Sequence, residues 1–407
     1  MNVNARYIVE DVKVTGIDSA RLSKRLLQEI QRLVGEKFNQ QAFDQLARRV
    51  RLELHAQTVS QKVTRGDKPE HVKVVLEVSP CCSSEPDVSL SKLLYHARQG
   101  WSGKAVGNFT VAPHTGLLLG LASDGDDLLE RYAGLLAGFE NRKVGSERIR
   151  LRFVFESYHQ QWNRATLTAL PLTATGGPEG LYRSRQAFEP TLSVAVTRSL
   201  TVSAGTDSQL LETMYPVSRY QSANALTGGL RYRRRFEDAQ GHTHTLEAGY
   251  EVRSAARAVA SDYAYTGQRW HFAYLLQGSK QAVVVDFTAG RLTGDAPLYE
   301  RYLLGNSTTL RGWSKFDVAP DGGNRMVHNS LEYRRTVGRR GDDSATVGVF
   351  YDTGAVWEAG QEADTRHSVG VAAWWGSNPL SSGLYLALAF PVKKGHIDPI
   401  FMAGTRF

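Results

Sequence analysis

Long stretches of the chain alternate strictly between apolar and charged residues, with a period of two. In residues 148–158, Ile149 and Phe153 fall on one face of an extended strand, whereas Arg150 and Arg152 fall on the other. Successive side chains of a β-strand point to opposite faces, so such a stretch forms a strand with one apolar and one charged face. This pattern restricts the chain to sheet structures that have one wet side.

The pattern recurs at 230–236 and 243–253. A soluble sandwich also alternates, but repeated Arg and Glu on one face with aromatic and branched residues on the other fit a barrel with a wet interior better. No apolar run approaches the ~18 residues that a transmembrane helix needs. We therefore predict a mainly β chain that forms an antiparallel transmembrane β-barrel.

The number of strands can be predicted from length. A tilted strand that crosses a membrane takes about 9–11 residues, and its connection brings the total to about 19. The part of the chain after residue 100 then provides about sixteen strands, which defines a predicted barrel at 101–407.

The first eighty residues have a different pattern. A strand at 7–14 is followed by two stretches with helical spacing, around Leu26 and around Phe43, and by strands at 58–64 and 71–78. The order strand, helix, helix, strand, strand predicts a small separate domain at 1–80.

A linker is predicted at 81–100 because it opens with serines and two prolines around the adjacent Cys81 and Cys82. Neighbouring cysteines do not reach ordinary disulfide geometry without strain, and the chain has no other Cys to complete a zinc site. We interpret them as linker thiols and expect neither a metal nor a cofactor.

The net charge of +8 raises the question of nucleic acid. The arginines fall at alternating strand positions rather than in one patch, so we expect them to line a lumen or face lipopolysaccharide, with no nucleic-acid partner. A secretory signal is not expected at Met1, and we interpret the chain as a mature or trimmed form.

A long irregular segment, about 293–324, separates two of the predicted strands. It contains Tyr-Glu-Arg-Tyr-Leu-Leu-Gly-Asn-Ser-Thr-Thr-Leu-Arg-Gly-Trp at 299–313. Structureless loops of this length are uncommon in compact folds and are usually functional. The segment is predicted to fold back and dock inside the barrel.

This segment resembles the sixth-loop signature of the superfamily that contains the outer-membrane protein assembly factor and the two-partner secretion transporters (the bacterial surface antigen family). Asn306 replaces the second glycine of that signature, and Trp313 takes its aromatic position. The strands around 329–334 and 349–357 and the last four residues, 404–407, resemble the family's following strands. Residues 7–78 more weakly resemble a polypeptide-transport-associated (POTRA) domain.

In that family the loop arginine points into the lumen and pairs with acidic groups on the wall. Alternation places Glu332 and Asp352 on the inner side of their strands, since Leu331, Tyr333, Val349 and Tyr351 suit the apolar outside. We predict that Arg311 meets both carboxylates. Gly312 leaves space at the turn and Trp313 packs on the wall, which together lock the loop.

The resemblance implies an outer-membrane insertase or polypeptide transporter, not an enzyme, with its POTRA-like domain in the periplasm. Expected partners are outer-membrane lipid and lipopolysaccharide, an unfolded client or secreted polypeptide, and periplasmic accessory proteins. The edge strand at 58–64 is a candidate surface for an extended client segment.

A weak lateral seam is predicted where the first and last strands close the barrel, between about 109–121 and 399–407. Pro113 lacks an amide donor and would weaken strand pairing. Gly404 and Phe407 are predicted to lie on the other side of the seam, where a terminal aromatic also resembles the address by which barrels are recognised for assembly.

Two other functions stay open. The chain can be the barrel-and-POTRA half of a patatin-like lipase fusion, serving as anchor or secretion unit, or a passive outer-membrane pore. Asp124, Asp126 and Asp127 cluster in a turn that could attract a cation, although a solvated turn is the favoured interpretation.

Overall fold

The computed structural model describes residues 7–16, 22–54, 58–79, 87–112, 114–123, 126–171, 180–213, 218–340, 343–378, 382–392 and 398–406. It divides into two compact units, Met1–Glu85 and Pro86–Phe407. Cys81 and Cys82 lie outside the described residues.

The first unit has the predicted order of elements. It consists of β1 (Ile8–Thr15), α1 (Lys24–Leu33), α2 (Gln40–Leu54), β2 (Thr58–Arg65) and β3 (His71–Ser79). The sheet order is β1-β3-β2, with β3 parallel to β1 and antiparallel to β2. The strand β2 therefore lies at a sheet edge.

One apolar face of each helix covers this sheet. Leu26 and Ile30 of α1 and Phe43 and Val50 of α2 are buried against the central strand, where Leu76 is fully buried. Residues spaced by three and four share a helix face, so the sequence alone gives both helices an inner side.

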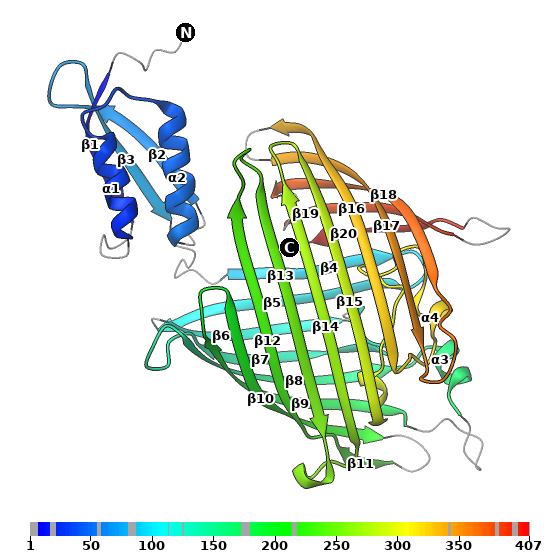
Figure 1. Ribbon diagram of the computed structural model, residues 1–407. Helices are drawn as coiled ribbons and strands as arrows, with labels where there is room; N and C mark the ends of the chain where they lie inside the picture. The colour runs from blue at the N-terminus through cyan, green and yellow to red at the C-terminus, as the bar shows by residue number, and fades with distance from the viewer. Residues whose placement is uncertain are drawn as a thin grey trace. The chain divides into compact units, whose positions relative to one another are not determined.

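The second unit is a closed antiparallel barrel (Figure 1). Its strands are β4 (Asp87–His96), β5 (Gly100–Ala112), β6 (Thr115–Ser123), β7 (Arg131–Asn141), β8 (Ile149–Gln161), β9 (Tyr182–Ala195), β10 (Leu200–Thr213), β11 (Arg219–Ser222), β12 (Ala225–Glu237), β13 (Thr243–Ala255), β14 (Ala264–Gln277), β15 (Gln281–Asp295), β16 (Arg325–Arg340), β17 (Asp343–Trp357), β18 (Arg366–Asn378), β19 (Ser382–Pro391) and β20 (Ile400–Arg406). Short helical segments α3 (Arg164–Ala169), η3 (Arg257–Val259), η4 (Leu298–Glu300) and α4 (Lys315–Val318) lie in the connections.

The barrel has sixteen strand positions, as predicted. The short β11 and the long β12 occupy one position, since both pair with β10, at its end and along its first half respectively. The remaining fifteen strands each occupy one position, and β20 closes the ring by pairing antiparallel with β4. An even number of positions lets an antiparallel ring close in this way.

The start of the barrel differs from the prediction. We expected a linker at 81–100, but β4 covers Asp87–His96 and pairs with both β5 and β20. The consecutive apolar residues Leu93, Leu94 and Tyr95 break the alternation, and the stretch follows a segment rich in serine and proline, so the sequence did not indicate a strand there.

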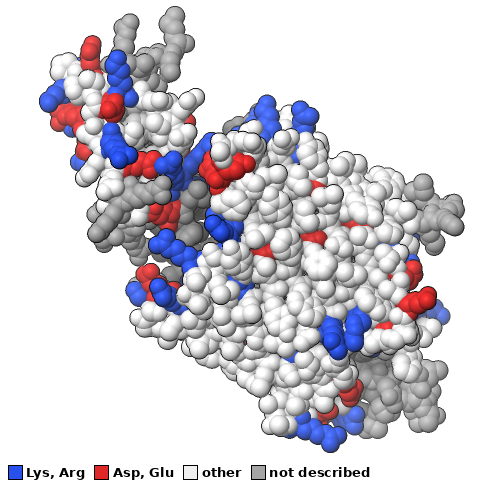
Figure 2. All heavy atoms as spheres, in the orientation of Figure 1, with Lys and Arg blue, Asp and Glu red and all other residues white. Residues whose placement is uncertain are grey.

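The two sides of the wall follow the alternation. On β16 and β17 the outer face carries exposed apolar side chains, including Leu331, Val349 and Tyr351, whereas Glu332 and Asp352 are buried on the inner face. Figure 2 shows a barrel surface that is largely uncharged in this view. Among the described residues no helix combines the length and apolar character needed to cross a membrane.

Connections at the two ends of the barrel differ in length. One end carries short turns, such as 278–280 between β14 and β15. The other end carries longer segments, and the longest, 296–324, joins β15 to β16. Its ends lie within three residues of the predicted bounds of 293–324.

Candidate functional site

The connection 296–324, called here the docked loop, is folded into the barrel rather than extended into solvent. Leu304 and Leu310 are fully buried, and they pack with Trp313, Met326 and Val356 in one apolar cluster. The cluster joins the loop to the inner faces of β16 and β17. A loop with this much buried apolar surface has one preferred position.

The tip of the loop is built by Asn306. Its side-chain oxygen accepts hydrogen bonds from the backbone N–H groups of Thr308 and Thr309, at 2.9 and 2.8 Å. Gly305 adopts a positive φ of 92° beside it, and Leu310 adopts one of 48° just before the arginine. An Asn side chain that satisfies local backbone donors is a standard way to hold a tight turn. Asn306 thus has a structural role in the tip.

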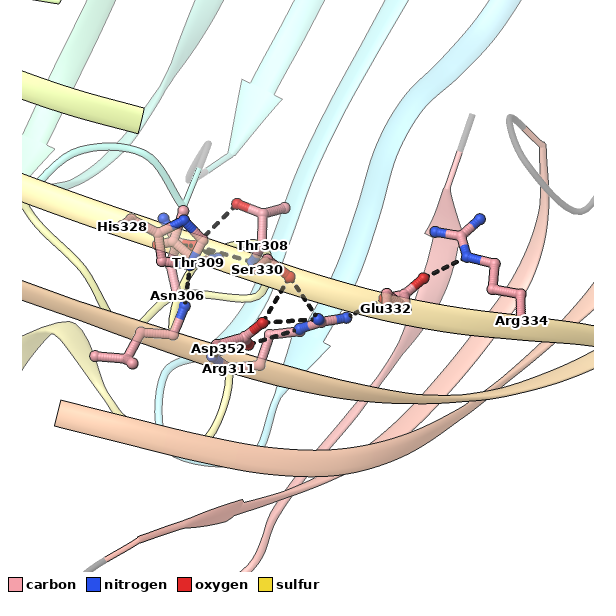
Figure 3. Close-up of polar contacts among 10 residues, drawn as sticks. Asn306, Thr308, Thr309, Arg311, His328, Ser330, Glu332, Arg334 and Asp352 are labelled. Carbon is pink, nitrogen blue, oxygen red and sulfur yellow. Dashed lines mark hydrogen bonds and ion pairs between the residues drawn. The ribbon is translucent and has the colours of Figure 1, made fainter. Parts of the chain in front are cut away.

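Arg311 lies at the centre of the site, between β16 and β17 (Figure 3). Its Nε and Nη2 donate to Oδ2 and Oδ1 of Asp352, both at 2.9 Å, and its backbone N–H donates to the same carboxylate at 3.0 Å. Its Nη1 donates to Oε2 of Glu332 at 2.6 Å. The guanidinium fork therefore bridges carboxylates from two adjacent strands, a geometry that lysine cannot reproduce.

Neighbouring groups complete the charge balance of this network. Ser330 donates to Asp352 at 2.7 Å, and Arg334 forms an ion pair with Glu332. The guanidinium carbon of Arg311 lies 3.5 Å from the ring centroid of Phe350. Arg311 is 3% exposed and Asp352 0%. Two acids and two guanidinium groups thus neutralise one another where water is largely excluded.

Gly312 and Trp313 pack the tip of the loop against β18 and β19. A Cβ at Gly312 would lie 2.6 Å from Cβ of Ser368 and 3.0 Å from the carbonyl carbon of Phe390. The Trp313 indole donates to the carbonyl of His367 at 2.9 Å and lies under the guanidinium of Arg366. The five residues that we assigned to the loop lock therefore lie in one place.

Other loop contacts have no signal in the sequence. Asp126, in the connection between β6 and β7, is buried and accepts a hydrogen bond from the backbone N–H of Ser307 at 2.8 Å. Its carbonyl accepts from Asn306 at 3.0 Å, and Lys315 donates to the carbonyl of Leu128. The solvated-turn interpretation is thus wrong for Asp126, while Asp124 lies outside the described residues.

The closing seam lies elsewhere than predicted. The last strand, β20, pairs with β4 and not with 109–121, because those residues belong to the β5–β6 hairpin. Gly404 lies opposite Leu94 in the seam, where a Cβ would lie 2.1 Å from the carbonyl oxygen of Leu93. Pro113 falls between β5 and β6, and both it and Phe407 lie outside the described residues.

The seam is the shortest of the pairings between neighbouring barrel positions in the described part of the chain. Five residue pairs join β20 to β4, from Met402–His96 to Arg406–Lys92. Seven pairs join β19 to β20, and eleven join β17 to β18. Backbone hydrogen bonds between strands hold a barrel closed, so opening at this seam breaks fewer strand pairs than opening elsewhere in the described barrel.

Comparisons with known proteins agree with this architecture. Residues 263–406 match the family model described as the Omp85 superfamily domain. The outer membrane protein assembly factor BamA of Nitratidesulfovibrio vulgaris is 30% identical over 114 residues, which are 25% of this chain and 14% of that protein. The chain thus aligns with only a small part of the length of this curated relative.

Solved structures show the same fold at low identity. BamA from Haemophilus ducreyi lacking POTRA domains 1–3 superposes with a TM-score of 0.59 at 16% identity, over 99% of this chain and 85% of that one. CdiB from Escherichia coli superposes with a TM-score of 0.57 at 12% identity, over 99% of this chain and 77% of that one. The loop lock and the last seven strands of the sixteen-position barrel lie within residues 263–406, the part of the chain that is similar to the Omp85 superfamily domain.

Proposed function

We propose that this protein is an outer-membrane insertase or polypeptide transporter, which assembles or translocates unfolded client polypeptides. The observation that carries the proposal is Arg311, held by Asp352 and Glu332 inside a barrel that closes through a five-pair seam and is similar to Omp85-type barrels. A loop that is fixed to β16 and β17 holds the shape of that part of the barrel, while the short seam between β20 and β4 is the place where the ring opens.

The first unit is a POTRA-like domain with a periplasmic location in this proposal. Its edge strand β2 presents unpaired backbone groups on one side, which can accept an extended client segment by β-augmentation. Backbone hydrogen bonds provide affinity that does not depend on the client's sequence, so one domain can bind several clients. The apolar outer wall of the barrel is in contact with outer-membrane lipid.

Client insertion into vesicles tests the proposal. A urea-unfolded outer-membrane barrel is added to lipid vesicles that contain the purified chain, and its folded fraction is followed by the gel shift between heated and unheated samples. We expect faster folding than in protein-free vesicles, and slower folding with Asp352→Asn than with the unchanged chain. Equal rates with and without the protein contradict the proposal, and a steady large conductance in planar bilayers would favour a passive pore instead.

A further inference from the structure

The docked loop touches the barrel wall at a second place, remote from the arginine lock. Tyr299 and Glu300 form the short helical turn η4 near the start of the loop, and their side chains contact β9 and β13 rather than β16 and β17. Tyr299 is 7% exposed. These contacts are independent of every residue that holds Arg311.

Glu300 is held by an arginine that is itself fixed to the wall. Its Oε1 accepts from Nη1 of Arg253 at 2.8 Å and from the hydroxyl of Tyr265 at 3.2 Å. The same Nη1 of Arg253 lies 2.5 Å from Oδ2 of Asp207 on β10, a fully buried carboxylate to which Gln209 also donates. Arg253 thus links the loop to β10 and β13 at once.

Tyr299 contacts another arginine, which is buried. The guanidinium of Arg185 on β9 lies between two rings, 5.0 Å from the centroid of Tyr299 and 5.5 Å from that of Tyr158 on β8. Tyr182 meets the Tyr299 ring edge-on at 6.1 Å. An arginine stacked between aromatic rings away from water is more strongly attracted to them than an exposed one.

The two contact regions lie on different parts of the wall. In ring order, β13 lies three positions from β16, and β9 lies seven positions from β17 when β11 and β12 count as one. The loop therefore spans part of the interior, with Tyr299 and Glu300 at one contact and Arg311 at the other.

We propose that the docked loop is a brace with a second anchor, made by Glu300 and Tyr299, in addition to the contacts around Arg311 and the tip, and that Arg253 and Arg185 are positioning residues for this second anchor. Release of Arg311 alone leaves the loop tethered to β9 and β13, so the interior stays obstructed. Full opening requires the second anchor to break as well. The account rests on contacts inside the barrel and does not depend on the proposed client-handling function.

Single-channel recording in planar bilayers tests the brace. Glu300→Gln removes the acidic charge at the second anchor, and Asp352→Asn removes an acidic charge beside Arg311. Both single variants and the double variant are made in the full chain. Glu251→Gln is the matched control, because Glu251 lies on the same face of β13, two residues from Arg253, and is exposed. Correct folding of each variant is checked by its heat-dependent gel shift.

We expect each single variant to open only briefly. The double variant should have an open probability about tenfold or more above that of either single variant, because the free energy of a hydrogen bond to a charged group corresponds to a population change of that size. Tyr299→Leu should act like Glu300→Gln and replaces it if that variant does not fold. The brace is wrong if Glu300→Gln and Tyr299→Leu match the Glu251→Gln control in both backgrounds. It is equally wrong if Asp352→Asn alone opens the pore as fully as the double variant.

Discussion

At the scale of single residues, the site depends on how the Arg311 guanidinium divides its hydrogen bonds between Asp352 and Glu332. Asp352 accepts three hydrogen bonds from Arg311 and a fourth from Ser330, whereas Glu332 accepts one from Arg311 and pairs with Arg334. Removing one charge from a buried pair is costly because the other charge remains without compensation. Asp352 is therefore the residue whose loss should matter most.

We predict that Asp352→Asn weakens loop docking by roughly 3–5 kcal/mol, while Ser330→Ala, which removes a neutral hydroxyl, weakens it by about 1 kcal/mol. Trypsin cleavage after Arg311 in the folded barrel measures docking, because a buried arginine is protected. Cleavage should be fast in Asp352→Asn and close to that of the unchanged chain in Ser330→Ala. The lock is contradicted if both variants are equally protected.

Gly312 gives a steric test of the same site. Gly312→Ala places a methyl group 2.6 Å from Cβ of Ser368, which overpacks the tip and should cost about 1–3 kcal/mol of docking. Gly338→Ala is the control, since a Cβ there meets nothing within 4 Å. Faster tryptic cleavage is expected in Gly312→Ala alone. Equal cleavage in the two variants would show that the tip does not need a glycine.

Alternation alone placed Glu332 and Asp352 on the inner wall, since a strand has only two faces. Contacts between distant connections could not be predicted in this way. Asp126 and Ser307 meet only because two connections fold over the same end of the barrel, and nothing in their local sequence encodes that meeting. The contact between Glu300 and Arg253 is likewise not predictable from the local sequence, because the two residues come together only in the closed barrel.

At the scale of elements, the strands with strong charge alternation were predictable and the first strand was not. β4 has a weaker pattern and follows a stretch rich in serine and proline, so its place in the barrel depends on partners at both sides. The sequence also does not predict that β11 and β12 share one strand position. Its two parts become one position only by pairing with β10.

Turns at the short end carry their own stabilising groups, and one of them should respond to pH. Asp238, between β12 and β13, accepts hydrogen bonds from the backbone N–H of His242 at 2.8 Å and of Gln240 at 2.9 Å, and its other oxygen contacts the His242 and His244 rings. The His242 backbone bond, followed by the two histidine rings, lowers the pKa of Asp238 below its ordinary value.

A carboxyl whose pKa is lowered by folding stabilises the turn above its unfolded pKa of about 3.9 and loses that effect as the pH falls through its folded pKa. We therefore predict that the hydrogen-exchange protection of the His242 amide decreases as the pH is lowered from 5 toward 2. The Gly278 amide is the control, because it donates to the carbonyl of Gln281 in a turn held by the backbone. A parallel decrease at both amides would contradict the role of Asp238.

At the scale of the whole molecule, many contacts between the loop and the wall contrast with a short closing seam. Loop contacts reach β9, β10, β13, β16, β17 and β18 and, through Asp317 and Arg98, the connection after β4, whereas the seam between β20 and β4 has five residue pairs and the Arg98–Asp398 ion pair at one end. We propose that the brace keeps one part of the ring in shape, so that strands separate at the seam. Length and strand spacing predicted the sixteen positions, but only the closed ring shows which pairing is shortest.

Client insertion with and without a locked seam shows whether the barrel must open between β20 and β4. Leu93→Cys and Thr405→Cys form a register pair across the seam, and Leu386→Cys with Ala403→Cys form a control pair between β19 and β20. Both pairs are made with Cys81→Ser and Cys82→Ser, so that only the engineered cysteines react. We predict that oxidation stops client folding in vesicles for the seam pair, that reduction restores it, and that the control pair stays active throughout. Full activity of the oxidised seam pair would contradict it.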